Sequence, residues 1–153
     1  MIIYFICPNK FKNLFILISG LFFYAWGEPI YVLIMLLSTL IDYTAGRLIH
    51  HFDSDNKKRT LFLVVSVCMN IGLLAIFKYS SFFIQNINSV FGADIYNPNL
   101  PLPIGISFYT FQSMSYTIDL YRRNIKVQRN FINFAAYVTL FPQIVAGPIV
   151  RYE

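Results

Sequence analysis

The feature that most constrains the fold is a series of apolar stretches separated by short polar ones. The apolar stretches cover residues 13–26, 30–49, 60–77, 104–121 and 131–150. The first is shorter than the roughly 20 residues that a helix needs to cross a bilayer, and the others approach that length. The pattern predicts an all-α fold, a polytopic transmembrane bundle of about five hydrophobic helices.

Composition supports a membrane protein and excludes several other classes. The chain is 57% hydrophobic and only 12% charged, whereas a soluble domain averages about 25% charged residues. So few polar side chains cannot cover the surface of a soluble globule. High hydrophobicity excludes disorder, and two cysteines among 153 residues exclude a disulfide-rich secreted protein. We therefore expect the lipid bilayer as the main partner of this chain.

Glycine and proline mark the expected helix ends. Gly27, Glu28 and Pro29 end the first apolar stretch, and Pro29 suits the first turn of a new helix. The stretches on either side are predicted to form a helical hairpin. A signal peptide is the alternative for the N-terminus, but no small-residue cleavage site follows the first stretch, so we reject it.

Three further segments are predicted to lie outside the helices. Residues 50–59 and 122–130 read as polar or basic loops, and residues 78–103 mix apolar residues with turn formers. The prolines at the end of that mixed segment cannot continue a helix.

The lysines and arginines predict an orientation. With the N-terminus inside, ten of the twelve basic residues fall on the cytoplasmic side, as the positive-inside rule requires; they are Lys10, Lys12, Arg47, Lys57, Lys58, Arg59, Arg122, Arg123, Lys126 and Arg129. Only Lys78 and Arg151 fall on the other side. This places a multi-pass protein in the inner (cytoplasmic) cell membrane. The net charge of +5 is explained by these loops, so we expect no nucleic-acid partner.

The stretch 104–121 is unusually polar for a membrane helix. Gln112, Ser115 and Asp119 follow at helical spacing and share one face. Polar groups in hydrocarbon must be satisfied by protein or water. The helix is therefore expected inside a bundle or beside a water-filled cavity. Hydrogen bonding between helices without any chemical role is an equal alternative.

Two carboxylates lie within apolar stretches. An intramembrane carboxylate is a candidate functional residue. However, Asp42 and Asp119 are both placed near the cytoplasmic end of their stretch, where the side chain can reach the interface. Asp119 also precedes Arg122 and Arg123 by one turn. A structural role is therefore expected for both carboxylates, with a local ion pair for Asp119.

The last apolar stretch contains its own breaks. Pro142 is expected to kink the helix, and Gly147-Pro148 to end it. Gln143 stands beside the kink, where carbonyl groups lose their partners. This pattern is typical of backbone that lines a cavity rather than lipid.

The two histidines do not predict a metal site. His50 and His51 precede Asp53 and Asp55 in the polar segment. Their spacing matches no fixed ligand set, and the basic residues 57–59 would oppose a cation. We interpret the segment as a solvated loop at the interface and expect no metal.

Three stretches resemble a known family. They are residues 13–26 with 37–43, residues 102–112 running on to Tyr116, Asp119, Tyr121 and Arg122, and residues 141–143 with 146–149. Together they resemble the membrane-bound O-acyltransferases, in the branch of alginate O-acetyltransferases and D-alanyl transferases. The resemblance covers nearly the whole chain.

The resemblance implies a function for a longer protein. Residues 1–153 would be the N-terminal part of a single membrane-embedded acyltransferase domain, truncated at both ends. The family's catalytic histidine would lie beyond Glu153, so no catalytic residue is assigned and this fragment alone is expected to be inactive. The full protein would move an acetyl or similar acyl group onto hydroxyls of an extracellular polysaccharide or cell-wall polymer.

Several details stay open at this level. No bound cofactor is expected, and the sequence does not identify the acyl donor. Partner proteins of a polysaccharide-modifying machinery are expected. Candidate tunnel-wall positions, from polarity and motif membership, are Ser107, Gln112, Gln143 and Arg151. A non-enzymatic membrane module, such as a transporter segment or an assembly partner, is the alternative, because a polar helix beside a broken one also suits a transporter.

The orientation can be tested by labelling single cysteines in a variant without Cys7 and Cys68. A cysteine at position 57 should react only after the membrane is permeabilised, whereas a cysteine at position 97 should react in intact cells. The reason is the asymmetry of basic residues. Labelling of position 57 from outside intact cells would contradict the topology.

Overall fold

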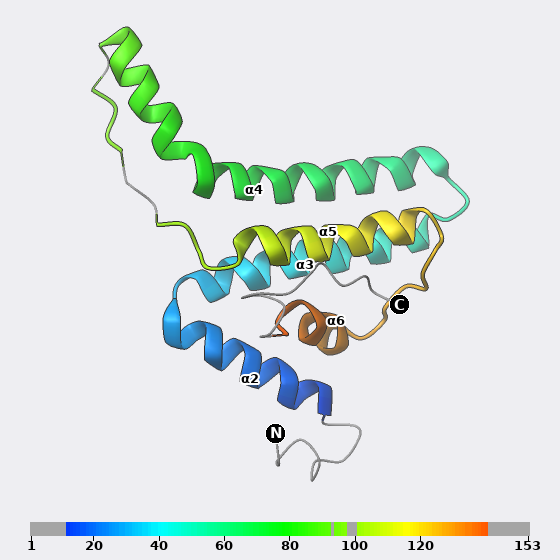
Figure 1. Ribbon diagram of the computed structural model, residues 1–153. Helices are drawn as coiled ribbons and strands as arrows, with labels where there is room; N and C mark the ends of the chain where they lie inside the picture. Colours follow the sequence, from blue (N-terminus) through cyan, green and yellow to red (C-terminus); the bar gives the residue numbers. More distant parts are fainter. Residues whose placement is uncertain (1–11, 93, 98–100, 141–153) are drawn as a thin grey trace.

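Helices are the regular secondary structure of the described part of the chain. A computed structural model describes residues 12–92, 94–97 and 101–140, and Figure 1 shows their arrangement. These residues form α2 (Lys12–Gly27), α3 (Tyr31–His51), α4 (Asn56–Phe91), α5 (Ile106–Tyr121) and α6 (Phe131–Val138), with no strand among them. The predicted all-α class is confirmed.

The first hairpin lies where the sequence predicts it. α2 ends at Gly27 and α3 begins at Tyr31, so Pro29 lies in the turn. The Tyr31 amide donates to the Glu28 carbonyl at 3.2 Å and closes that turn. The two helices meet at one end of the molecule (Figure 1).

The predicted loop at residues 50–59 is shorter than expected. α3 continues to His51 and α4 begins at Asn56, so only residues 52–55 lie between them. Asp55 is the N-cap of α4, and its Oδ1 accepts from the amides of Lys57 at 3.1 Å and Lys58 at 3.3 Å. The Lys58 amide holds the pKa of Asp55 below its ordinary value. A capping side chain therefore starts the helix within the segment that polarity alone marks as a loop.

Helix α4 runs well past the apolar stretch that predicts it. Its 36 residues make it about 54 Å long at 1.5 Å per residue, against a hydrocarbon core of about 30 Å. It ends before Gly92, whose φ of 62° is the left-handed conformation common after helices. The predicted mixture at residues 78–103 is therefore wrong as far as Phe91. In Figure 1 the C-terminal part of α4 turns away from the other helices.

Helix α6 is shorter than the predicted stretch 131–150. It has 8 residues and begins after Asn130, whose Oδ1 accepts from the Ile132 amide at 2.9 Å. Thr139 follows its last residue. Pro142 and Gly147-Pro148, predicted to kink and end this helix, lie outside the described residues.

The helices pack in two groups. α3, α4 and α5 contact one another, and α6 contacts α2, α3 and α5. In Figure 1 the connections of the successive helices α2 to α5 alternate between the two ends of the molecule, so neighbours along the chain run antiparallel. α5 is thus enclosed by α3, α4 and α6.

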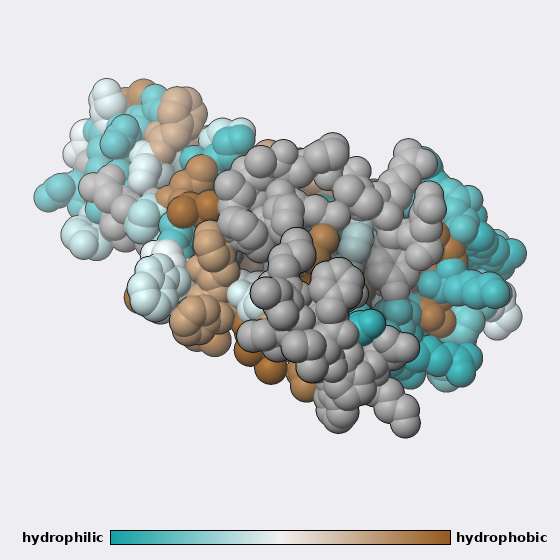
Figure 2. All heavy atoms as spheres, turned by 60° about the horizontal axis from the view of Figure 1, so that its bottom comes forward, coloured by the Kyte–Doolittle hydropathy of each residue, from teal (hydrophilic) through white to brown (hydrophobic). Residues whose placement is uncertain are grey.

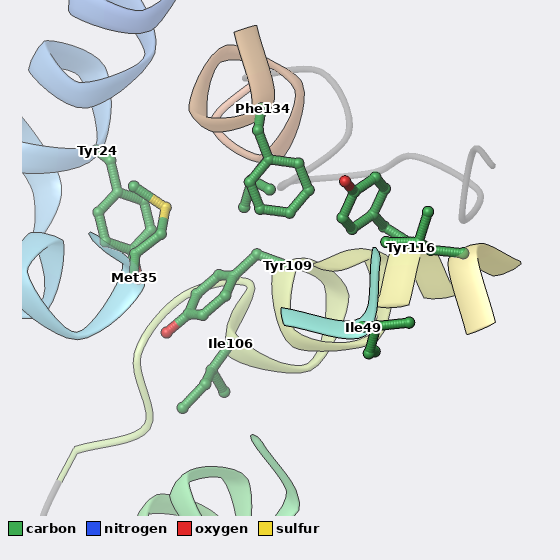
Figure 3. Close-up of a cluster of buried hydrophobic side chains, with 9 residues drawn as sticks. Tyr24, Met35, Ile49, Ile106, Tyr109, Tyr116 and Phe134 are labelled. Carbon is green, nitrogen blue, oxygen red and sulfur yellow. The ribbon is translucent and has the colours of Figure 1, made fainter. Parts of the chain in front are cut away.

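Aromatic side chains fill the centre of the bundle (Figure 3). Tyr116 of α5 and Phe134 of α6 approach with ring centroids 4.6 Å apart, and Tyr24 of α2 meets Tyr109 of α5 edge-on at 6.4 Å. The remaining buried members of this cluster are Met35, Ile49, Ile106, Leu120 and Val138. The cluster therefore draws residues from α2, α3, α5 and α6.

The outward faces are strongly apolar. α3 and α4 are long and apolar enough to cross a membrane by length and composition, and α2 is a shorter apolar helix. Large apolar side chains on the surface include Phe22 and Trp26 of α2 and Leu61 and Phe82 of α4. Figure 2 shows brown, apolar patches between two ends of the molecule that both carry teal, polar side chains. These features support a membrane protein.

One close approach joins α2 to the end of α6. A Cβ added to Gly20 would lie 2.3 Å from the carbonyl oxygen of Thr139. No real Cβ approaches an oxygen so closely, and a backbone carbonyl cannot swing aside as a flexible side chain can. Only glycine therefore fits at this position without displacing α2 from α6.

Gly20→Ala should destabilise the protein by about 1–3 kcal/mol, the usual cost of overpacking. Thermal unfolding in detergent measures the loss. Gly72→Ala is the matched control in α4, because nothing lies within 4 Å of its added Cβ; it should be neutral or stabilising by up to about 1 kcal/mol. Equal melting temperatures for the two variants would contradict the close contact.

Candidate functional site: a buried polar interior

The polar face predicted on α5 points into the bundle. Gln112 and Asp119 of that face are buried, with 3% and 9% of each residue exposed, and Ser115 is half-buried. Ser113 and Thr117, next to that face, are 0% exposed. The Gln112 Nε2 donates to the Tyr137 carbonyl of α6 at 2.9 Å. The expectation that α5 lies inside a bundle is confirmed. Gln112 forms a hydrogen bond between two helices, as the alternative interpretation of this polar helix predicts.

The other proposed wall positions have different outcomes. Ser107 lies in the first turn of α5 and is half-buried. Gln143 and Arg151 lie outside the described residues, so their assignment to a tunnel wall stays a prediction. Of the four positions, the structure thus gives a specific contact to Gln112.

Asp42 does not reach the interface as expected. It lies within α3, which runs from Tyr31 to His51, close to the predicted stretch 30–49. The residue is 0% exposed, so its carboxylate does not reach the interface. A structural role remains, but in the interior of the bundle rather than at its edge.

Asp42 is the centre of a hydrogen-bond network between α3 and α4. Its Oδ1 accepts from the Ser66 hydroxyl and from the Asn70 Nδ2, the latter at 2.7 Å. The Asn70 Oδ1 in turn accepts from the Ser38 hydroxyl at 2.7 Å. All four side chains are at most 2% exposed. The two helices therefore share hydrogen bonds through Asp42 Oδ1, while its Oδ2 has no hydrogen-bond partner among the described residues.

Asp119 does not form the predicted local ion pair. Within the described residues no ion pair joins it to Arg122 or Arg123, and Arg123 instead pairs with Asp53, with 3.2 Å between Nη2 and Oδ1. The backbone carbonyl of Asp119 accepts from the Asn124 amide at 3.0 Å. The chain reverses after α5, and this turn directs Arg123 toward the loop before α4.

The histidines belong to a helix and not to the predicted loop. His50 and His51 form the last turn of α3. Asp53 pairs with Arg59 and Arg123, and Asp55 caps α4. In the part of the chain that the structure describes, no group of three or more histidine, cysteine or carboxylate side chains is placed to hold a metal ion.

The buried network holds helices together and presents no reactive group to a substrate. A carboxylate that is fully enclosed and already accepts two hydrogen bonds cannot reach an acceptor hydroxyl. The sequence reasoning missed Ser38, Ser66 and Asn70. Their spacing was the available signal, since Ser38 and Asp42 stand four residues apart, as do Ser66 and Asn70, and such pairs share a helix face.

The chain is similar to bacterial acetyltransferases over nearly its entire length. It is 34% identical to the probable alginate O-acetylase AlgI of Pseudomonas aeruginosa, over 99% of this chain and 30% of that protein. The resemblance to this acyltransferase branch is confirmed. A second probable alginate O-acetylase, from Azotobacter vinelandii, is 33% identical over 99% of this chain and 31% of its own length.

A relative with another printed acceptor matches as well. The peptidoglycan O-acetyltransferase of Helicobacter pylori is 30% identical over 94% of this chain and 32% of that protein. The chain therefore spans about one third of the length of these curated relatives. No protein-family model and no solved structure matches the chain.

Asp42→Leu should strongly destabilise the protein, because Ser66 and Asn70 lose their shared acceptor in a dry interior. An unsatisfied buried group costs about 1–3 kcal/mol. Asp42→Asn, which keeps a carbonyl acceptor in the same place, should retain most of the stability. The measurements are the melting temperature in detergent and the amount of protein in membranes.

Asp94→Leu serves as the control for Asp42→Leu. Asp94 is exposed beyond the end of α4, so its replacement should change neither quantity. An Asp42→Leu protein as stable as the Asp94→Leu protein would show that the network contributes nothing to the fold.

Proposed function

We propose that this chain is part of a membrane-embedded O-acyltransferase. The full protein transfers an acetyl or similar acyl group to hydroxyls of an extracellular polysaccharide, such as alginate, or of a cell-wall polymer. One observation carries the proposal: two named kinds of O-acetylase match 94–99% of this chain. The chain spans about one third of those relatives, so the activity is proposed for the longer protein.

Within that protein, residues 1–153 would act as the N-terminal part of one membrane domain. Transfer to a hydroxyl at neutral pH needs a base close to the acceptor proton. The described histidines are at one end of α3, and the buried carboxylate of Asp42 is enclosed. The catalytic base is therefore proposed to come from residues beyond Glu153, while α5 and α6 form part of a tunnel wall that includes Ser107, Gln112, Gln143 and Arg151.

The proposed setting is the inner membrane, crossed several times. The basic end of the bundle would face the cytoplasm, where the acyl donor is taken up, and the acceptor polymer would lie outside. Acyl transfer to an extracellular polymer requires other proteins to make and deliver that polymer, so partners from a polysaccharide-modifying machinery are part of the proposal. The chemical identity of the donor is left open.

The transporter alternative is less well supported. It rests on a polar helix beside a broken helix, and this combination suits the wall of an enzyme tunnel equally well. The relatives named above are acetyltransferases in their printed descriptions. Their descriptions favour the enzyme.

Disruption of the gene that encodes this chain should abolish or greatly reduce ester-linked acetyl groups on the cell-surface polysaccharides. The intact gene supplied in trans should restore them. The measurement is base-labile acetate released from the purified polymer, with polymer yield as the control for synthesis. Unchanged acetylation after disruption would overturn the proposed function.

Residues 1–153 supplied alone should leave acetylation at the empty-vector level, because the proposed base is missing. The protein must first be shown to be present in membranes by immunoblotting. Acetylation by this fragment, lost on His50→Ala and His51→Ala, would show that these histidines act and that the assignment of the base is wrong.

A further inference from the structure

A cavity of about 440 Å³ opens at the basic end of the bundle. It lies where the end of α3, the start of α4 and the segment after α5 converge. Its charged and titratable lining residues are His50, Asp53, Arg59, Arg123, Lys126 and Arg129. Apolar side chains, among them Ile49 and Leu120, form the remaining wall. Four permanent cations therefore face one carboxylate.

Arg59 is the buried member of this group. Its side chain is 6% exposed, and its Nη2 donates to the Tyr121 carbonyl at 2.7 Å. The guanidinium lies 5.2 Å from the centroid of the Tyr121 ring. Its Nε has no hydrogen-bond partner among the described residues. The guanidinium is thus held firmly at the cavity with part of its donor capacity unused.

One carboxylate serves two arginines. Asp53 Oδ1 lies 3.6 Å from the Arg59 Nε and 3.2 Å from the Arg123 Nη2. A single negative charge cannot neutralise two guanidinium groups, and Lys126 and Arg129 add further positive charge to the same lining. Of these charges only Arg59 is removed from water, because the Arg123 and Asp53 side chains are 61% and 57% exposed. The lining therefore presents an excess of positive charge at an opening that solvent reaches.

We infer that this cavity binds the phosphate group of an anionic membrane lipid. Arginine forks match phosphate oxygens with two parallel hydrogen bonds, and Arg59 and Arg123 both border the cavity. Basic pockets between membrane helices on the cytoplasmic side recognise anionic headgroups. The charge pattern places this end of the bundle at that surface. The apolar wall provides a path for the first part of a lipid chain.

Arg123 has an unusual backbone conformation for a residue with a long side chain. Its φ of 62° is left-handed, a conformation that non-glycine residues rarely adopt because their Cβ comes too close to the following carbonyl oxygen. It occupies the position after a helix where glycine is the usual residue. The backbone strain of an arginine at this position is offset by the contacts of its guanidinium with the side chain and the carbonyl of Asp53.

The test uses the whole protein in detergent, without native lipid. The probes are short-chain phosphatidylglycerol, short-chain phosphatidylcholine and inorganic pyrophosphate, and the readouts are the melting temperature and the number of bound lipids in native mass spectra. Phosphatidylglycerol should bind and raise the melting temperature, and phosphatidylcholine should do so far less. If pyrophosphate protects and phosphatidylglycerol does not, the cavity takes a soluble phosphate compound and the lipid assignment is wrong.

Three variants identify the site. Arg123→Gly removes the guanidinium and relieves the left-handed strain, so the fold should keep or gain stability while phosphatidylglycerol binds about tenfold or more weakly. Lys126→Gln should weaken binding in the same direction. Lys78→Gln, on α4 outside the cavity lining, should leave binding unchanged. Unaltered phosphatidylglycerol affinity in both Arg123→Gly and Lys126→Gln would overturn the proposal, as would an equal loss in Lys78→Gln.

Discussion

The hydrogen bonds around Asp42 set the packing of the central helices. Water is absent from hydrocarbon, so a polar side chain on a membrane helix must find its partner on a neighbouring helix. Asp42 and Ser38 on α3 can be satisfied only where Ser66 and Asn70 of α4 lie opposite them. This requirement favours one axial register of α4 against α3, because a shift by one turn would break the hydrogen bonds that join Asp42 to Ser66 and Asn70 and Ser38 to Asn70.

The close contacts of α5 follow from that register. A Cβ added to Gly46 of α3 would lie 2.9 Å from the Tyr116 ring, so α5 can approach α3 only where glycine leaves room. On the opposite side Gln112 connects α5 to α6. α5 is therefore positioned by shape against α3 and by the Gln112 hydrogen bond against α6.

Helix positions could be predicted from apolar stretches, but several helix ends could not. The Gly27–Pro29 break is local and was read correctly. Residues 50–59 look like a loop by polarity, yet the last turn of α3 and the Asp55 cap place most of them in helices. Similarly, the polar residues after Phe77 end an apolar pattern without ending the helix, which stops only at Gly92. Hydrophobicity indicates which part of a helix contacts lipid or the protein core, whereas capping side chains and glycines indicate where the helix ends.

The polar sites depended on pairings that one sequence does not reveal. Asp42 was recognisable as a carboxylate within an apolar stretch, but its burial was not predicted, because its partners Ser66 and Asn70 come from the next helix. Arg59 entered the sequence reasoning only as one loop charge among ten. Its burial, and its sharing of Asp53 with Arg123, arise because the turn after α5 comes to lie against the start of α4. Such contacts join residues more than sixty positions apart and leave no periodic signal.

Hydrogen bonds at three levels connect α5 and its neighbouring helices. At one end Tyr24 donates to the Ile104 carbonyl at 2.9 Å and Glu28 accepts from the Ile104 amide at 3.0 Å, joining α2 to the start of α5. In the middle the Asp42 network joins α3 to α4. At the basic end Arg59 joins α4 to the Tyr121 carbonyl at the end of α5. A helix held at both ends and packed along its length has little freedom to move. α5 therefore suits the fixed side of a transfer path better than a gate, and the moving or reacting groups of the proposed enzyme are expected in the rest of the protein.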